Sequence, residues 1–315
     1  MTVTARLAQH GFMAALGAAV LFGAGTPLAK LLLGDINPWL LAGLFYLGSG
    51  LGLWLLRRLR RAAPVRLPAG EWPWLAGAIV SGGVIGPVLL MLGLANLPAT
   101  AAALLLNAES LFTALLAWFI FKEHVNLRTA LGMLAIVLGA VSLSWSPATG
   151  FALGWPALAI LGACLAWGLD NNLTRRVSEV DASWLTSVKG TVAGSINMAL
   201  ALFAGASLPS LPLVLGAAAV GFVSYGVSLT LFVVGLRHLG TARTAAYFSV
   251  APFFGAALAV PLLNDAVTPG LLFAALAMGV GVWLHLTERH DHAHQHGNLT
   301  HSHPHFPDAQ HRHRH

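Results

Sequence analysis

The sequence has little charge and almost no cysteine. Asp, Glu, Lys and Arg make up 9% of its 315 residues, whereas soluble domains carry about one quarter charged residues. Hydrophobic residues make up 57%, which is more than a soluble core needs and which a lipid bilayer acting as the solvent explains. The single cysteine, Cys164, excludes an internal disulfide framework, and its apolar surroundings indicate a small packing residue.

Further absences exclude several classes of function. No segment has the G-x-x-x-x-G-K-[ST] form of a P-loop, so we expect no transport driven by ATP. Nothing resembles a repeated selectivity-filter segment, which argues against a channel. The histidines lie almost entirely near the C-terminus, so a catalytic set of His with carboxylates is missing and we expect no enzyme. The net charge of +6 comes largely from arginines in short loops, which indicates membrane topology and no nucleic-acid partner.

Apolar runs long enough to cross a bilayer recur along the chain, with turn residues between them. Only helices suit these runs, because backbone groups in lipid must form hydrogen bonds within the segment. We therefore predict an all-α membrane protein. Its ten transmembrane helices are expected at 11–33, 37–56, 72–95, 99–121, 128–146, 153–174, 183–205, 211–236, 241–263 and 268–287.

Positive charge is confined to alternate loops. The loop 57–66 holds five arginines, and the same set of loops also holds Lys122, Arg128, Arg175, Arg176, Arg237 and Arg243. The other set has almost no Lys or Arg, with Lys30 as the nearest exception. Because positive loops face the cytoplasm, we predict a multi-pass protein of the cell (inner or plasma) membrane. Its N-terminal segment 1–10 and its C-terminus are both expected to be cytoplasmic.

The chain divides into two similar halves, residues 11–146 and 153–287. The segment 22–27 (FGAGTP) aligns with 167–172 (WGLDNN), and 110–117 (SLFTALLA) aligns with 252–259 (PFFGAALA). Five spans per half is an odd number, so the second half must enter the membrane upside down relative to the first. Such an inverted repeat allows alternating access and indicates a transporter. The alternative is that the repeat records only gene duplication and packing.

Two stretches of sequence carry a family resemblance. They are 111–118 (LFTALLAW), which leads to Lys122-Glu123, and 166–168 (AWG), which opens the second half. On these residues the chain resembles the drug/metabolite transporter superfamily, specifically proteins with two EamA domains, over nearly everything before the tail. The resemblance implies a ten-helix carrier, commonly an exporter of small metabolites or drugs coupled to protons or to exchange. Its partners are then the lipid bilayer and a small-molecule substrate, and a homodimer is left open.

Ionisable groups inside the spans mark candidate sites, because each is costly there unless it is paired or wet. Asp170 lies beside Asn171 and Asn172 near the inner end of the sixth span, and Lys189 lies at matched depth in the seventh. We predict that Asp170 and Lys189 form a buried ion pair in one state; a static structural pair is the alternative. Asn171 and Asn172 either line a cavity next to the pair or begin the cytoplasmic cap.

Two further spans contribute candidates for the substrate or coupling site. The position of the first half that corresponds to Asp170 lies in Gly25-Thr26-Pro27. Proline removes a helix hydrogen bond, and interruptions at corresponding positions of two halves point to a transporter site, so Thr26 and Pro27 are included. Glu109, with Asn107 beside it, falls near the middle of the fourth span. We interpret Glu109 as a proton-coupling or cation-binding group; a neutral carboxyl bonded to a neighbouring helix is the alternative.

The composition changes abruptly after the last span. Residues 288–315 contain almost no aliphatic side chain, so we predict a disordered cytoplasmic tail. Neutral imidazole binds zinc, nickel and copper, and the alternation of histidines predicts metal binding by His290, His292, His294, His296, His301, His303 and His305. Otherwise no cofactor is required. The tail gathers ions for export, senses metal or pH for an unrelated carrier, or only solubilises the chain.

These observations favour a secondary active transporter that exports a small polar metabolite or drug-like solute by alternating access, with proton or exchange coupling. The alternative is an exporter of a divalent transition metal that the His-rich tail gathers. The absence of a thiolate or methionine ladder in the spans weakens this alternative.

Overall fold

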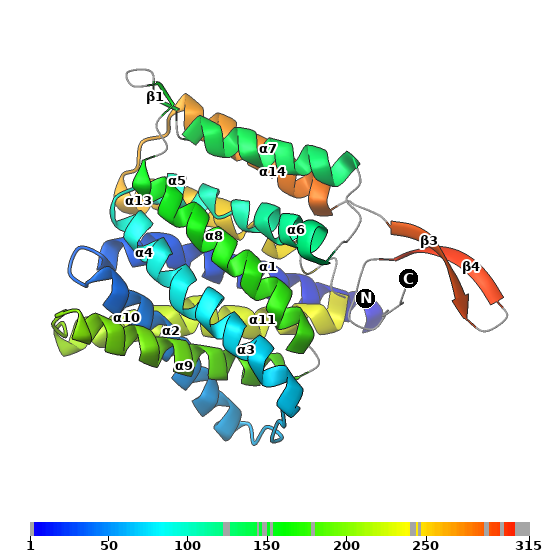
Figure 1. Cartoon of the computed structure of the whole chain (residues 1–315), viewed down its shortest axis with the longest axis horizontal. Helices are drawn as coiled ribbons and strands as arrows, with labels where there is room; N and C mark the ends of the chain where they lie inside the picture. The colour runs from blue at the N-terminus through cyan, green and yellow to red at the C-terminus, as the bar shows by residue number, and fades with distance from the viewer. Residues whose placement is uncertain are drawn as a thin grey trace.

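The computed structural model describes residues 3–121, 127–143, 145–146, 150–151, 154–177, 180–239, 244, 247–286, 290–296 and 299–305. Each of the ten predicted spans contains helix (Figure 1). The first half consists of α1 (Val3–Leu32), α2 (Pro38–Leu59), η1 (Ala69–Glu71), α3 (Trp72–Ala78), η2 (Ile79–Ile85), α4 (Gly86–Ala95), α5 (Ala99–Leu105), α6 (Ala108–Phe121) and α7 (Leu127–Leu143).

A short antiparallel pair, β1 (Trp145–Ser146) and β2 (Gly150–Phe151), follows α7. The second half consists of α8 (Trp155–Thr174), η3 (Arg175–Val177), α9 (Ala182–Phe203), α10 (Leu211–Gly221), η4 (Phe222–Val227), α11 (Ser228–Leu239), α13 (Ala251–Leu263) and α14 (Pro269–Leu286). Two further strands, β3 (His290–His296) and β4 (Leu299–His305), pair antiparallel and project from the helical body (Figure 1).

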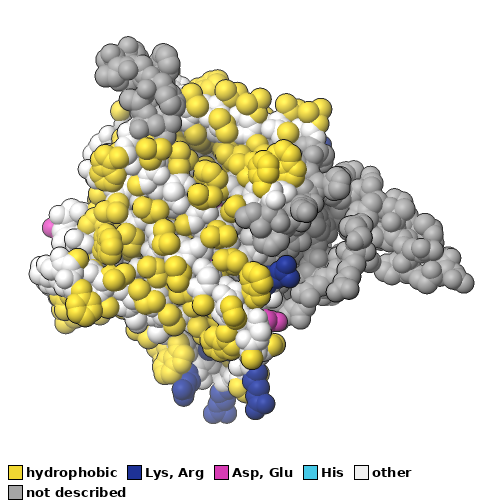
Figure 2. All heavy atoms as spheres, viewed as in Figure 1, with side chains coloured by type: hydrophobic (Ala, Val, Ile, Leu, Met, Phe, Trp, Pro, Cys, Tyr) yellow, Lys and Arg dark blue, Asp and Glu magenta, His cyan; other side chains and the backbone are white. Residues whose placement is uncertain are grey.

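The helical body has the surface of a membrane protein. Five helical segments are long and apolar enough to cross a membrane by length and composition: His10–Leu32, Pro38–Leu59, Ala69–Ala95, Ala99–Leu116 and Leu211–Gly235. Figure 2 shows hydrophobic side chains spread over the described part of one face, with most of the visible Lys and Arg side chains at its lower edge. The protein is therefore a multi-pass membrane protein, and the count of ten spans stays a prediction.

Pairwise packing of the helices relates the two halves by an approximate two-fold axis. In the first half α1 packs against α11 and α13, and its counterpart α8 packs against α4 and α6. The two sets of contacts correspond, because α11 and α13 occupy the positions in the second half that α4 and α6 occupy in the first. Helices at equal positions in the two halves also pack against each other, as α2 does with α9 and α7 with α14 (Figure 1). Such an arrangement agrees with the predicted inverted repeat.

Small residues lie where helices approach most closely. Three small-x-x-x-small pairs of the sequence fall at helix contacts: Gly48 and Gly52 face α10 and η4, Gly82 and Gly86 face α8, and Gly190 and Gly194 face α2. A Cβ added to Gly190 would lie 2.8 Å from the Cα of Gly50. The α2–α9 pair therefore depends on glycine on both sides of its interface.

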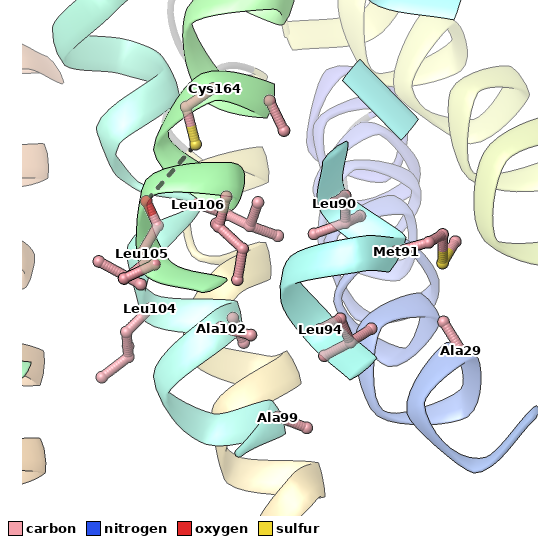
Figure 3. Packing of buried hydrophobic residues seen from close by; sticks show 14 of the residues in the cluster. Ala29, Leu90, Met91, Leu94, Ala99, Ala102, Leu104, Leu105, Leu106 and Cys164 are labelled. Atoms are coloured by element: carbon pink, nitrogen blue, oxygen red, sulfur yellow. Dashed lines mark hydrogen bonds between the residues drawn. The ribbon is translucent and has the colours of Figure 1, made fainter. Parts of the chain in front are cut away.

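The single cysteine is a packing residue, as predicted. Cys164 is fully buried in a cluster that includes Leu90, Leu94 and Leu104. Figure 3 shows its sulfur pointing toward the Leu105 carbonyl oxygen, to which the thiol donates at 3.6 Å. Leu105 is the last residue of α5, so this weak bond lies at the end of a helix.

Three sequence predictions differ from the structure. The helix α1 begins at Val3 and so extends into the segment 1–10. The fifth span ends at Leu143, because Trp145 and Ser146 pair with β2. Residues 288–315 were expected to be disordered, and the structure instead pairs the backbones of β3 and β4. The alternation of histidine with other residues has the two-residue period of a strand, which composition alone does not take into account.

Candidate functional site

Asp170 and Lys189 form an ion pair between α8 and α9. The ammonium of Lys189 donates to both carboxylate oxygens of Asp170, at 2.5 and 2.7 Å. The Thr174 hydroxyl, one turn further along α8, donates to the same carboxylate at 2.8 Å. Only 11% of the Asp170 side chain and 16% of the Lys189 side chain are exposed. The two residues that the sequence placed at matched depth are therefore in contact, and water has little access to them.

The ion pair lies against an irregular segment of the third span. Residues Ile79–Ile85 of η2 form a π-helix, in which the hydrogen bonds between turns are one residue longer than in an α-helix. A Cβ on Gly82 would overlap the Asp170 carboxylate. Glycine at position 82 therefore gives the Asp170 carboxylate the room to face Lys189.

Side chains from three other helices bind carbonyl groups of the π-helix. The Tyr46 hydroxyl donates to the Gly82 carbonyl oxygen at 2.7 Å, and the Trp167 indole donates to the same oxygen at 2.9 Å. The Asn197 amide donates to the Gly83 carbonyl at 2.9 Å. Backbone groups at membrane depth must be satisfied inside the protein, and here the partners come from α2, α8 and α9.

Glu109 lies next to the ion pair, on the other side of α8. Its carboxylate accepts a hydrogen bond from the Asn171 amide at 2.8 Å, and the same amide is 3.3 Å from the Thr113 hydroxyl. Asn171 follows Asp170 directly, so one turn of α8 carries an acidic group toward α9 and an amide toward α6. Glu109 is only partly buried. The arrangement can bind a cation or exchange a proton beside a fixed ion pair.

The fourth span is broken immediately before Glu109. The helix α5 ends at Leu105 and α6 begins at Ala108, so Glu109 stands in the first turn of α6. Three side chains hold the break: the Asn107 amide donates to the Leu104 carbonyl at 2.9 Å, the Ser110 hydroxyl donates to the Asn107 carbonyl at 2.8 Å, and Cys164 bonds Leu105. Discontinuous helices of this kind form the substrate sites of many transporters.

Asn172 is a structural residue inside α8. Its amide donates to the Gly168 carbonyl at 2.8 Å and to the Thr113 carbonyl of α6 at 3.2 Å, and the residue is buried. The helix continues to Thr174. Both asparagines thus lie within the helix, and Asn172 links α8 to α6.

The expected interruption at Pro27 is absent. The helix α1 is continuous from Val3 to Leu32, and Thr26 is buried within it. Proline at position 27 leaves the Gly23 carbonyl without its helical donor. A Cβ on Gly255 of α13 would lie 2.7 Å from that oxygen, so α13 packs directly over the carbonyl that lacks its helical donor. Thr26 and Pro27 therefore lie within an unbroken α1, close in sequence to Gly23, where α13 approaches that helix.

Sequence reasoning missed the π-helices, although a signal for them was present. The segment 80–84 (VSGGV) of the third span has a counterpart in 223–227 (VSYGV) of the eighth. Both are π-helical, in η2 and η4. A serine and a glycine recur at the same spacing, which marks corresponding positions of the repeat. Tyr225 of η4 lies against Tyr46, with ring centroids 5.7 Å apart, so the two π-helices flank one aromatic contact.

The C-terminal end of α2 and the N-terminal end of α9 are joined by an ion pair and hydrogen bonds. Arg57 donates to the Asp181 carboxylate at 2.5 Å and to the Ser183 hydroxyl at 2.6 Å. Asp181 is also the N-cap of α9 and accepts from the Trp184 backbone N–H at 2.9 Å. Partial desolvation acts to raise the Asp181 pKa, but hydrogen bonds from Ser183 and Trp184 together with the charge of Arg57 outweigh it and lower that pKa.

Lys30, the exception to the charge asymmetry, has a structural role. Its ammonium donates to the carbonyl oxygens of Leu94 and Ala95, at 2.7 and 3.0 Å, at the C-terminal end of α4. Cations are favoured at that end of a helix because the last carbonyl groups have no partner there. Lys30 therefore adds little free positive charge to its loop.

The predicted metal ligands of the tail lie on β3 and β4, of which the backbone is described. The backbone register places His290 opposite His305, His292 opposite His303 and His294 opposite His301. Within the described part of the chain, no group of three or more His, Cys, Asp or Glu side chains is arranged to hold a metal ion.

The fold and the site together define a class. Two similar helical halves packed about an approximate two-fold axis, with a buried ion pair, a second carboxylate and interrupted helices between them, are features of a membrane transporter. The chain belongs to the EamA-like transporter family, whose model matches residues 9–145 and 154–287. The two matches correspond to the two predicted repeats, and the family is one of transporters rather than enzymes.

Comparisons with known proteins agree with this assignment. An uncharacterized transporter from Methanothermobacter thermautotrophicus is 28% identical over 276 residues, which cover 81% of this chain and 80% of that protein. A crystal structure matches with a TM-score of 0.64 at 19% sequence identity, over 89% of this chain and 95% of that one. The latter similarity shows the fold alone.

Proposed function

We propose that this transporter is a secondary active carrier that exports a small polar metabolite or drug-like solute by alternating access, with proton or exchange coupling. The observation that carries the proposal is the buried Asp170–Lys189 pair with Glu109 on the adjoining face of α8. Buried charge is costly in a membrane and is retained where a pathway needs it. A polar substrate can compete for these groups, and a solute lacking polar groups cannot.

The coupling role belongs to Glu109. Its single amide partner, Asn171, can donate to the carboxylate and, after rotation of the amide, accept from a protonated carboxyl. Both protonation states of Glu109 therefore retain a hydrogen bond, as a proton-exchanging group requires. Asp170 differs, because its carboxylate already accepts hydrogen bonds from the Lys189 ammonium and the Thr174 hydroxyl.

The π-helical segments η2 and η4 are the places where we expect the helices to rearrange during transport. The spans that contain η2 and η4 correspond in the repeat, and each carries a π-helix in place of regular helix. Such segments are local departures from the α-helical ladder and often occur at functional sites. We expect rearrangement at η2 to change the support of the ion pair, because Gly82 lies directly against Asp170.

The test compares cells that make equal amounts of the full chain, of Asp170→Asn and of Glu71→Gln. Glu71 lies in η1, outside the site, and its substitution is the matched loss of one carboxylate. Metabolites of the cells and of the medium are measured by mass spectrometry. We expect at least one solute to leave the cells with wild type and with Glu71→Gln but not with Asp170→Asn. If no solute depends on Asp170, the proposal is wrong.

A solute found in this way is then used for reconstitution. Purified protein in vesicles that enclose a pH-sensitive dye separates the two kinds of coupling. Solute-driven proton movement supports proton coupling, whereas uptake that occurs only against preloaded solute supports exchange. Flux that does not saturate with solute concentration would instead indicate a channel.

The second candidate function is export of a divalent transition metal. It is favoured by the register of β3 and β4, which brings histidine positions of the two strands opposite each other, together with the affinity of imidazole for zinc, nickel and copper. Cells that make the full chain, a chain ending at Arg289, or Asp170→Asn are compared for metal content and metal tolerance. Metal content that follows the helical body and requires Asp170 supports export; metal content that is indifferent to Asp170 rejects it.

A further inference from the structure

We propose that the groove between the end of α2 and the start of α9 is a binding site for an anionic phospholipid. The groove has a volume of about 560 Å³. One wall is the end of α2 with the turn that follows it, and the other is the outer face of α9. Its lining residues are Trp54, Arg57, Arg58, Arg61, residues 62–65, Trp184, Ser187, Val188, Thr191 and Val192. Nothing in the transport mechanism above uses this surface.

The basic end of the groove carries positive charge that no acidic side chain in the described part of the chain neutralises. Arg57 is committed to Asp181 and Ser183. Arg58 and Arg61 are exposed, and neither has an acidic partner among the described residues. The guanidinium of Arg58 lies 4.6 Å from the centroid of the Trp54 ring, a cation–π contact that fixes its position. Two unpaired guanidinium groups at one end of a groove suit a phosphate.

The backbone at Arg61 supplies an independent argument. Hydrogen bonds from Arg61 N–H to the Arg58 carbonyl and from Ala62 N–H to the Arg57 carbonyl close α2 in the manner of a Schellman motif. Arg61 occupies the left-handed position of that motif, with φ of 49°. Glycine is the residue favoured there, and a bulky side chain is disfavoured. An arginine in this left-handed conformation is an outlier that points to a role for its side chain.

The other end of the groove is apolar and open to the lipid-facing surface. Val188 and Val192 line it on α9, and Trp54, one turn before Arg58 on α2, lines the groove between its basic and apolar parts. Trp54 is 50% exposed and Val192 is 41% exposed, as expected for side chains in contact with acyl chains. A soluble anion would use only the arginines. A phospholipid uses both ends, with its phosphate at Arg58 and Arg61 and an acyl chain along α9. Basic pockets between membrane helices bind anionic headgroups in this way.

The measurement is lipid binding by native mass spectrometry of the purified full chain in detergent. Three probes are compared: phosphatidylglycerol, phosphatidylcholine with the same acyl chains, and glycerol 3-phosphate. We expect binding of phosphatidylglycerol alone. Equal binding of phosphatidylcholine would show a merely apolar groove, and displacement of phosphatidylglycerol by equimolar glycerol 3-phosphate would show a site for soluble anions. Either result overturns the proposal.

Variants test the residues. Arg58→Gln and Arg61→Gln should each weaken phosphatidylglycerol binding about fivefold, as expected for one basic residue at an anionic headgroup. Arg60→Gln is the matched control, because Arg60 lies in the same turn but does not line the groove. If Arg60→Gln weakens binding equally, the arginines act only as a general basic surface and the site is wrong.

Arg61→Gly separates binding from folding. Glycine relieves the left-handed backbone, so we expect this variant to unfold at a higher temperature than wild type in lipid-free detergent while it binds phosphatidylglycerol less tightly. Unchanged lipid binding by Arg61→Gly would show that the Arg61 side chain does not contact the headgroup. A lower unfolding temperature would remove the backbone argument, and with it the reason to assign Arg61 to a ligand.

Discussion

Lys189 reaches both oxygens of Asp170 across the interface of α8 and α9, within 2.5 and 2.7 Å. Removing either partner leaves an uncompensated buried charge, which costs roughly 3–5 kcal/mol. We therefore expect Asp170→Asn and Lys189→Met each to lower the thermal stability of the detergent-solubilised protein. The double variant should be more stable than either single variant, because no charge is then stranded. A double variant no better than the singles would show that the pair contributes nothing.

The close approach of Gly82 to Asp170 gives a second prediction. Gly82→Ala places a methyl group where the carboxylate lies, and overpacking of this kind costs about 1–3 kcal/mol. Gly216→Ala is the control, because a Cβ at that helical position meets no atom within 4 Å. The control should be neutral or more stable by up to about 1 kcal/mol. Thermal unfolding of both variants decides whether space at Gly82 is required.

Glu109→Gln tests the coupling group without removing its hydrogen bond. The amide oxygen of glutamine can still accept from Asn171, so the local geometry is retained while the exchangeable proton is lost. We expect Glu109→Gln to transport the solute with a much weaker dependence on pH than wild type. The measurement is solute flux in vesicles across a series of pH values. A variant that keeps the full pH dependence of wild type would exclude Glu109 as the proton site.

Asp181 gives a prediction at the membrane surface. Asp181→Asn keeps an N-cap and loses only the attraction to Arg57, which is worth about 0.5 kcal/mol at an exposed position. Asp181→Ala also loses the cap, at about 1 kcal/mol more. The folded-state pKa of Asp181 lies below its usual value of 3.8, so this stabilisation is present above that pH and is lost as pH falls through the lowered pKa. The unfolding temperatures of wild type and Asp181→Asn should therefore differ at pH 6, and the difference should shrink only as pH falls below about 4.

The sequence predicted the parts of this protein that depend on composition and simple periodicity. Long apolar runs between turn residues predicted the helices, and the aligned motifs predicted the two repeats that the family model matches. The contact of Asp170 with Lys189 followed from equal depth and opposite sign. Each of these inferences needs only the positions of residues along the chain and no knowledge of how the helices pack.

The irregular backbone could not be predicted in the same way, because it depends on partners from other helices. The π-helix at η2 is supported by Tyr46, Trp167 and Asn197, which are distant from it in sequence. Pro27 illustrates the opposite error, since a local rule predicted an interruption in a helix that is continuous and has α13 packed closely against it. The repeated 80–84 and 223–227 motifs were the available signal, but nothing in them alone specifies a π-helix.

The ion pair occurs in only one half of the repeat. At the aligned positions of the first half the chain carries Gly25 where the second carries Asp170, and Leu44 where the second carries Lys189. Gly25 lies against Ser224 of η4, as Asp170 lies against Gly82 of η2. The two halves thus share a topology, but only the second has the stabilising interaction of an ion pair at these positions. If transport exchanges their conformations, the states facing the two sides of the membrane have different free energies, and the carrier rests predominantly in one orientation until solute or a proton shifts the population.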